Sequence, residues 1–181
     1  MRILKSAAVV LGLALVALPA AAAIKAMTLT ELMGITTDVV HGKILSSTTF
    51  RLDYPFEGAV WTKLSVEGDS MRTLAPVKTD VVFLGSHEAA DRFTVSEMPT
   101  LQDSRVGNEA VIFFYKDPQM QGDSRNVVFA LDSIYRVETA FGSPVVVGKG
   151  EGFAFPENIK LDDARVAVRA AHLELAKKAG K

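Results

Sequence analysis

The spacing of apolar residues changes twice along this chain, and this change constrains the fold more than any other feature of the sequence. Residues 28–31 match the capping-box pattern and predict a short helix that ends near Gly34. From Asp38 to Leu45 apolar and polar side chains alternate, as in a strand. Residues 161–175 return to the three- and four-residue spacing of a helix. The predicted order is therefore a short helix, a sheet and a longer helix.

Apolar runs that lie between the first strand and the C-terminal helix predict further strands. They cover residues 60–66, 80–84, 110–115, 127–131, 134–137 and 144–147. Residues 46–58 are polar and contain Tyr54-Pro55, so we expect a connection there. These patterns predict an α+β fold: a small antiparallel β-barrel or sheet of five to seven strands, with a short N-terminal helix and a C-terminal helix.

The N-terminus has the three parts of a cleavable secretory signal peptide. Arg2 and Lys5 provide the positive start, and residues 7–18 form an apolar stretch of signal-peptide length. The small side chains of Ala21 and Ala23 fit a signal peptidase site. We expect residues 1–23 to be removed; the alternative is an uncleaved anchor, which would need about 20 consecutive apolar residues.

The mature chain, residues 24–181, is expected to form one domain without disulfides. The sequence contains no cysteine, which excludes disulfides, thiolate chemistry and a lipid attached to an N-terminal cysteine. Removal of Arg2 and Lys5 leaves basic residues outnumbered by the 21 acidic ones. This balance argues against a nucleic-acid groove and against binding to an anionic membrane surface. We expect no membrane span after cleavage, and a periplasmic or secreted protein, with the periplasm of a Gram-negative cell as the first choice.

The segment between the predicted strands at 80–84 and 110–115 is the main candidate for function. Residues 86–108 form a long connection, and such loops often carry binding residues. Its candidate binding residues are His87, Glu88, Asp91, Arg92 and Phe93. The alternative is that its apolar residues pack as a small cluster under the loop.

Catalytic and metal-binding motifs are not recognisable around these residues. His87 and Glu88 are adjacent, whereas the HExxH motif places two imidazoles on one face of a helix. Ser86 beside His87 is too local to form a triad, whose members come together through the fold. His41 lies in a strand pattern and is interpreted as a packed residue that needs only a hydrogen-bond partner. We therefore expect no catalytic residue, metal site or cofactor.

Two motifs resemble those of a widespread group of exported bacterial proteins of unassigned function. Leu29-Thr30-Glu31-Leu32 is similar to that group's opening helix, and residues 38–44 (DVVHGKI) are similar to its first strand. Residues 60–68, 81–85 and 106–114 fill places in a pattern similar to netrin-like, or metalloproteinase-inhibitor-like, barrels. The resemblance implies an OB-like barrel with a long loop beside its binding face. Inhibitors of that family chelate zinc through an N-terminal cysteine, so no inhibitor residue is carried over to this cysteine-free chain.

These observations predict an exported, non-enzymatic binding module that contacts another exported protein through residues 86–108 and the adjoining barrel edge. One alternative is a periplasmic hydrolase or metal-binding enzyme that uses His87 with nearby carboxylates. Another alternative is a structural subunit of an envelope assembly.

Cleavage after Ala23 predicts that the exported chain begins at Ile24. The small residues before this bond fit the peptidase, so mass spectrometry of the N-terminal peptide should find Ile24, or a residue next to it, in first place. An exported chain that still begins at Met1 would contradict the signal-peptide interpretation.

Overall fold

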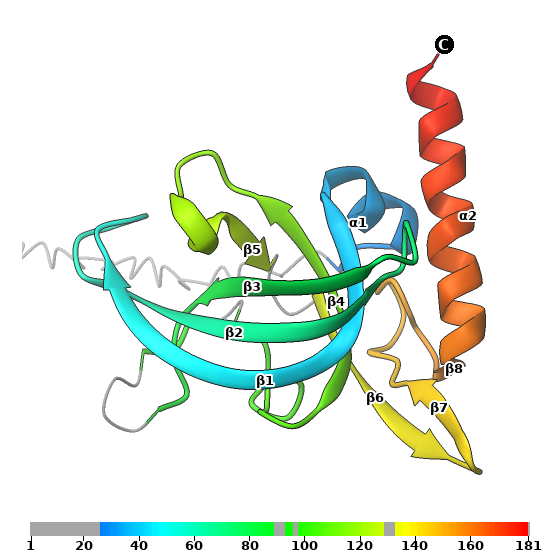
Figure 1. Ribbon diagram of the computed structural model, residues 1–181, viewed down its shortest axis with the longest axis horizontal. Helices are drawn as coiled ribbons and strands as arrows, with labels where there is room; N and C mark the ends of the chain where they lie inside the picture. The colour runs from blue at the N-terminus through cyan, green and yellow to red at the C-terminus, as the bar shows by residue number, and fades with distance from the viewer. Residues whose placement is uncertain (1–25, 89–92, 96–97, 129–132, 181) are drawn as a thin grey trace, which may run out of the picture.

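The computed structural model describes residues 26–88, 93–95, 98–128 and 133–180 (Figure 1). Its elements follow in the order α1 (Leu29–Ile35), β1 (Asp38–Leu52), β2 (Ala59–Ser70), β3 (Pro76–Leu84), β4 (Glu109–Lys116), the 3-10 helix η2 (Gly122–Arg125), β5 (Asn126–Val128), β6 (Ile134–Ala140), β7 (Ser143–Val146), β8 (Ile159–Lys160) and α2 (Leu161–Ala179). No helix among these described residues is both long and apolar enough to cross a membrane.

Five of the strands close into a small barrel. β1 pairs with β2 and with β4, β2 pairs with β3, and β4 pairs with β5, all antiparallel. A parallel contact between β3 and β5, at Val82 and Val127, completes the ring. The predicted α+β fold, with a small β-barrel, a short N-terminal helix and a C-terminal helix, is confirmed.

The sheet differs from the prediction in two respects. One pairing is parallel: with the other four contacts of the five-stranded ring antiparallel, β3 and β5 run in the same direction. The described strands of the sheet number eight rather than five to seven, because β6 leaves the barrel edge at β4 and continues into β7 and the two-residue β8. A strand of two residues leaves no periodic pattern in the sequence.

β1 is longer than predicted and extends through most of the expected polar connection. It runs to Leu52 because β2 pairs with it from Val40 to Leu52. A bulge between Ile44 and Ser46 inserts Leu45, so that Leu45 and Ser46 are both exposed. The bulge interrupts the alternation of burial, and the second half of the strand therefore loses its period-two signal.

Glycines allow β1 and β2 to approach closely where the barrel closes. Gly42 pairs directly with Gly68, at the point where β1 also pairs with Ala110 of β4. A Cβ atom on Gly68 would collide with the carbonyl oxygen of His41, and one on Gly42 would lie 2.5 Å from the carbonyl oxygen of Glu67. Glycine is therefore required at this crossing.

Apolar residues form one cluster inside the barrel and another between the barrel and the helices. Successive residues of β4 belong to different clusters. Ile112 packs inside the barrel, whereas Phe113 packs toward the helices. Phe113, Tyr135 and Phe155 make edge and tilted ring contacts at centroid distances of 5.1 to 6.1 Å. β4 is thus buried on both faces, as its continuous apolar run predicted.

The two helices form largely as expected. The capping box of α1 is present: the Glu31 amide donates to Thr28 Oγ1, and a Glu31 carboxylate oxygen accepts from the Thr28 amide. Gly34 lies inside this helix, which ends one residue later at Ile35. The first half of α2 is buried through Leu161, Ala164, Val168 and Ala171, and its second half projects beyond the barrel (Figure 1).

Alanine at Gly68 should destabilise the barrel, whereas alanine at Gly34 should not. We expect Gly68→Ala to lower the free energy of unfolding by about 3 kcal/mol or to prevent folding, because the new methyl group meets main-chain atoms. Gly34 is helical with open space around it, so Gly34→Ala should raise stability by about 0.5 to 1 kcal/mol. Urea denaturation of the two variants measures both effects, and equal stabilities would contradict the role given to Gly68.

Candidate functional site

The second half of the long connection, residues 98–108, is fixed to the fold by a buried carboxylate. Asp103 is only 5% exposed. Its Oδ1 accepts from Arg136 Nη1 at 3.3 Å, and its Oδ2 accepts from Lys149 Nζ at 3.1 Å. Thr100 completes the turn, because its hydroxyl donates to Asp103 Oδ2 and accepts from the Asp103 amide. A buried charge of this kind is tolerated only when it is paired, so the contacts hold the segment in one position.

Both ends of this segment are also tied to the barrel. Met98 is buried and joins the cluster inside the barrel. At the other end, the Ile44 amide donates to the carbonyl oxygen of Asn108 at 2.9 Å, and the Gly107 amide donates to the carbonyl oxygen of Ile44 at 2.8 Å. The segment is therefore part of the rigid structure, not a loose connection.

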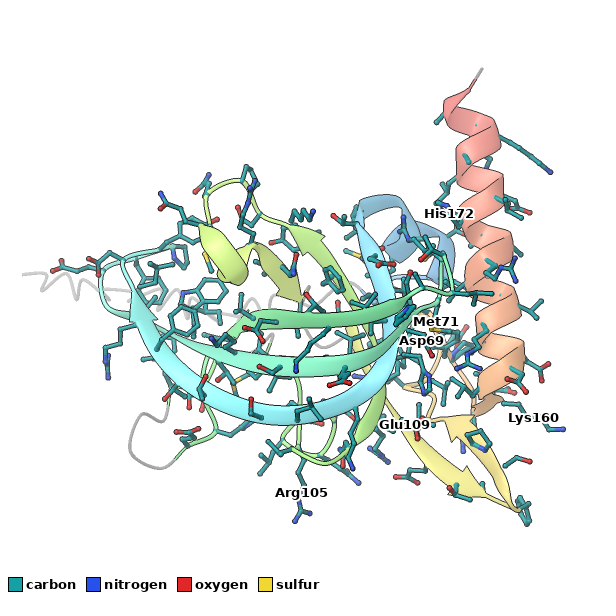
Figure 2. All side chains as sticks on the ribbon, viewed as in Figure 1. Asp69, Met71, Arg105, Glu109, Lys160 and His172 are labelled. Carbon is teal, nitrogen blue, oxygen red and sulfur yellow. The ribbon has the colours of Figure 1, made fainter. Side chains whose placement is uncertain are left out.

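The exposed side chains of the anchored segment include Leu101, Arg105 and Val106, which we call the loop surface. Leu101 is 59% exposed and Val106 is 48% exposed. Within the described part of the chain, no hydrogen bond or ion pair holds the Arg105 guanidinium, and Figure 2 shows this side chain pointing away from the barrel. The loop surface thus combines exposed apolar groups with an unpaired cation.

Hollows lie on both sides of the loop surface. The small hollow, of about 310 Å³, is lined by Ser47 of β1, Thr62 of β2, Phe83 of β3 and residues of the connection, among them Ser86, His87, Glu88, Leu101, Ser104, Arg105 and Val106. The large hollow, of about 710 Å³, is lined by Leu101, Gln102, Arg105, Asn108, Arg136, Val137 and Glu138. Leu101 and Arg105 border both hollows. These volumes are in the range that receives a side chain or a small ligand.

The face of β2 and β3 on which OB barrels often bind ligands is covered by this chain's own residues. Trp61 is only 4% exposed, and its ring stacks on that of Tyr54 at a centroid distance of 6.3 Å. The Trp61 indole N–H donates to the Tyr54 carbonyl oxygen, and the Tyr54 hydroxyl donates to Asp117 Oδ2 at 3.2 Å. These contacts join the connection after β1 to the connection after β4. Together the two connections cover Trp61.

Of the predicted site residues, His87, Glu88 and Phe93 are described, and each contacts other groups of this chain. His87 Nε2 lies 2.8 Å from the carbonyl oxygen of Pro99. A carbonyl oxygen only accepts, so Nε2 must carry a hydrogen and is not free to bind a metal. Glu88 accepts from the hydroxyl of Thr49 at 3.4 Å. His87 and Glu88 both line the small hollow.

Phe93 packs on Phe56 of the connection after β1, with ring centroids 5.8 Å apart, and exchanges main-chain hydrogen bonds with Ser86. Ser86 is completely buried, and its hydroxyl accepts from the Glu88 amide, so it is not presented as a nucleophile. Asp91 and Arg92, like Ala21 and Ala23, lie outside the described residues. Among the described residues no group of three His, Asp or Glu side chains could hold a metal ion.

A polar cluster that the sequence did not predict joins the barrel to α2. His41 of β1 is 8% exposed, and its Nδ1 lies 3.0 Å from Arg165 Nη2. Its Nε2 lies 2.6 Å from Glu109 Oε1, in a direction that falls outside hydrogen-bond geometry. A guanidinium only donates, so Nδ1 accepts and the hydrogen of the neutral ring is on Nε2, facing Glu109. Figure 2 shows Glu109 and Asp69 at the end of the barrel near α2.

The electrostatics of this cluster favour the neutral form of His41. Burial lowers the pKa of His41 below its ordinary value of 6.5. Glu109 opposes this effect, and Arg165 adds to it. A protonated ring would also direct a second N–H at the Arg165 guanidinium. Protonation of His41 therefore weakens the contact between β1 and α2.

Acidification should destabilise the protein through His41. Because the folded state binds this proton less tightly than the unfolded state, the free energy of unfolding should fall as the pH drops below about 6.5. His41→Gln should flatten this dependence between about pH 7.5 and about pH 5.5, because an amide cannot be protonated in that range. Denaturation at several pH values measures the slope. His172→Gln, on α2 outside the cluster, is the control, and equal slopes for His41→Gln and the parent chain would contradict the assignment.

Comparisons with protein-family models, with curated proteins and with solved structures found no match to this chain. The resemblance to netrin-like barrels, which the sequence pattern indicated, therefore stays a prediction.

Proposed function

We propose that this protein is an exported, non-enzymatic binding module that recognises a segment of another protein at the loop surface. One observation supports this function above all others: Leu101 and Val106 are about half exposed on a segment that buried ion pairs hold in place. A rigid support of this kind removes much of the entropic cost of ordering a binding loop. Exposed apolar groups on such a loop are typical of a recognition surface.

The chemistry of the loop surface indicates the kind of segment that would bind. The Arg105 guanidinium offers fixed N–H donors, which match a carboxylate. Leu101 and Val106 provide apolar contact beside the small hollow, which is large enough for one side chain. The preferred ligand is therefore an extended segment that carries an acidic residue close to a large apolar residue.

Export rests on the signal-peptide pattern of residues 1–23. The contacts of Ser86 and His87 favour structural roles over the hydrolase alternative. The structural-subunit alternative stays a prediction.

Selection from a displayed library of short peptides tests the proposed function with the purified full chain. We expect the selected peptides to combine an acidic residue with a large apolar residue, because these groups complement Arg105 and Leu101. Binding should weaken about tenfold or more with Arg105→Glu and with Leu101→Ser, which remove a charge-assisted and an apolar contact. Isothermal titration with one selected peptide measures both effects.

Matched controls are available on α2. Leu173 is 58% exposed, like Leu101, and Arg169 is exposed, like Arg105. Leu173→Ser and Arg169→Glu should leave the affinity unchanged, since both residues lie away from the loop surface. If the selected peptides lack acidic residues, or if Leu101→Ser and Leu173→Ser bind them equally, the loop surface is not the recognition site.

A further inference from the structure

The second half of β1 has a neighbouring strand on one side only. Residues 40–43 pair with both β2 and β4, whereas Ser46–Phe50 pair, among the described residues, with β2 alone. In the described part of the chain, no further main-chain hydrogen bond is made by Ser46–Phe50. Figure 1 shows this half of β1 as the outermost strand beside β2 and β3. The barrel therefore carries an open strand edge next to the long connection.

The register identifies which main-chain groups point outward at this edge. Ile44 exchanges hydrogen bonds with Gly107 and Asn108, so its N–H and C=O face away from β2. The bulge then places Leu45 and Ser46 together opposite Ser65 of β2. Main-chain direction alternates along a strand, and this alternation turns the N–H and C=O groups of Ser47 and Thr49 away from β2.

Within residues 46–50, this edge lacks two of the devices that often protect a strand from pairing with another chain. Such edges commonly carry charged side chains or proline. Residues 46–50 are Ser-Ser-Thr-Thr-Phe, which contain neither, and threonine and phenylalanine favour the extended conformation. Unpaired N–H and C=O groups at this spacing are complementary to the main chain of an added strand.

The open edge is continuous with the loop surface. Ser47 lines the small hollow together with Leu101, Arg105 and Val106. The Thr49 hydroxyl contacts Glu88, which lines the same hollow. A strand that pairs with Ser47 and Thr49 would therefore pass beside the hollow, and every second side chain of that strand could point into it.

We infer that the partner's segment binds as an additional strand along Ser46–Phe50. Its main chain pairs with the outward groups of Ser47 and Thr49, an apolar side chain enters the small hollow, and a carboxylate meets Arg105. This inference rests on the proposed function and specifies its binding mode. A second copy of this chain is a poorer occupant, because residues 46–52 contain no carboxylate that could meet Arg105.

Backbone methylation of a selected peptide tests this binding mode directly. N-methylation at residues that pair with the edge should weaken binding about five- to tenfold, because each removes one main-chain hydrogen bond and adds a clash. Methylation at the intervening residues should have little effect, since their N–H groups point away from β1. The expected result is thus an alternating pattern along the peptide.

Two measurements on the protein complete the test. Ser47→Pro removes the outward N–H and should weaken peptide binding about five- to tenfold, whereas Ser47→Ala keeps this N–H and serves as the matched control. Hydrogen exchange on the parent chain, which needs no variant, should show new protection of the Ser47 and Thr49 amides when the peptide binds.

The outcomes separate this inference from the function on which it rests. If binding requires Leu101 and Arg105 but tolerates N-methylation at every position and protects neither amide, strand addition is wrong and the proposed function stands. If no peptide depends on Arg105, both are wrong. A concentration-dependent dimer that Ser47→Pro dissociates would assign the edge to a second copy and overturn the inference.

Discussion

The double pairing of β1 is the constraint on which the rest of this structure depends. Between residues 40 and 43 this strand pairs with β2 on one side and with β4 on the other, and this closes the barrel. The close approach is sterically possible because Gly42 faces Gly68, where a side chain on either residue would meet main-chain atoms. Burial of Val40 and Ile44 inside the barrel follows from this closure.

The same strand accounts for where the candidate binding surface lies. β4 begins at Glu109, so on that side the described residues give Ile44 only the Gly107–Asn108 turn and give Ser46–Phe50 no paired strand. The long connection lies beside this open half, and Asp103 holds it there through Arg136 and Lys149. Because the connection is anchored by charge rather than by apolar packing alone, Leu101 and Val106 can remain exposed without making it mobile.

The His41 cluster shows how the barrel and α2 depend on one another. Apolar burial along the first half of α2 provides most of the attachment, and Arg165 adds a directional contact to His41. The acceptor role of Nδ1 requires a neutral ring, and the Glu109 contact stabilises the Nε2 hydrogen. The attachment of the helix is therefore coupled to the protonation state of a residue that lies in the barrel-closing part of β1.

Local patterns in the sequence determined the two helices, the buried strand β4 and the position of the long connection. Capping and periodicity depend on residues only a few positions apart, so they are visible without the fold. The full length of β1 was hidden by its bulge, and the parallel contact between β3 and β5 joins strands that are distant in the chain. Only the tertiary structure brings Arg165 within hydrogen-bond distance of His41, 124 residues away in the chain. The same holds for Lys149 and Asp103, which are 46 residues apart. The tertiary structure also decided that Ser47 lies on the edge of β1 beside β2, whereas Trp61 is covered. Charge pairs and open edges depend on which segments the closed barrel brings together, and no local pattern records that arrangement.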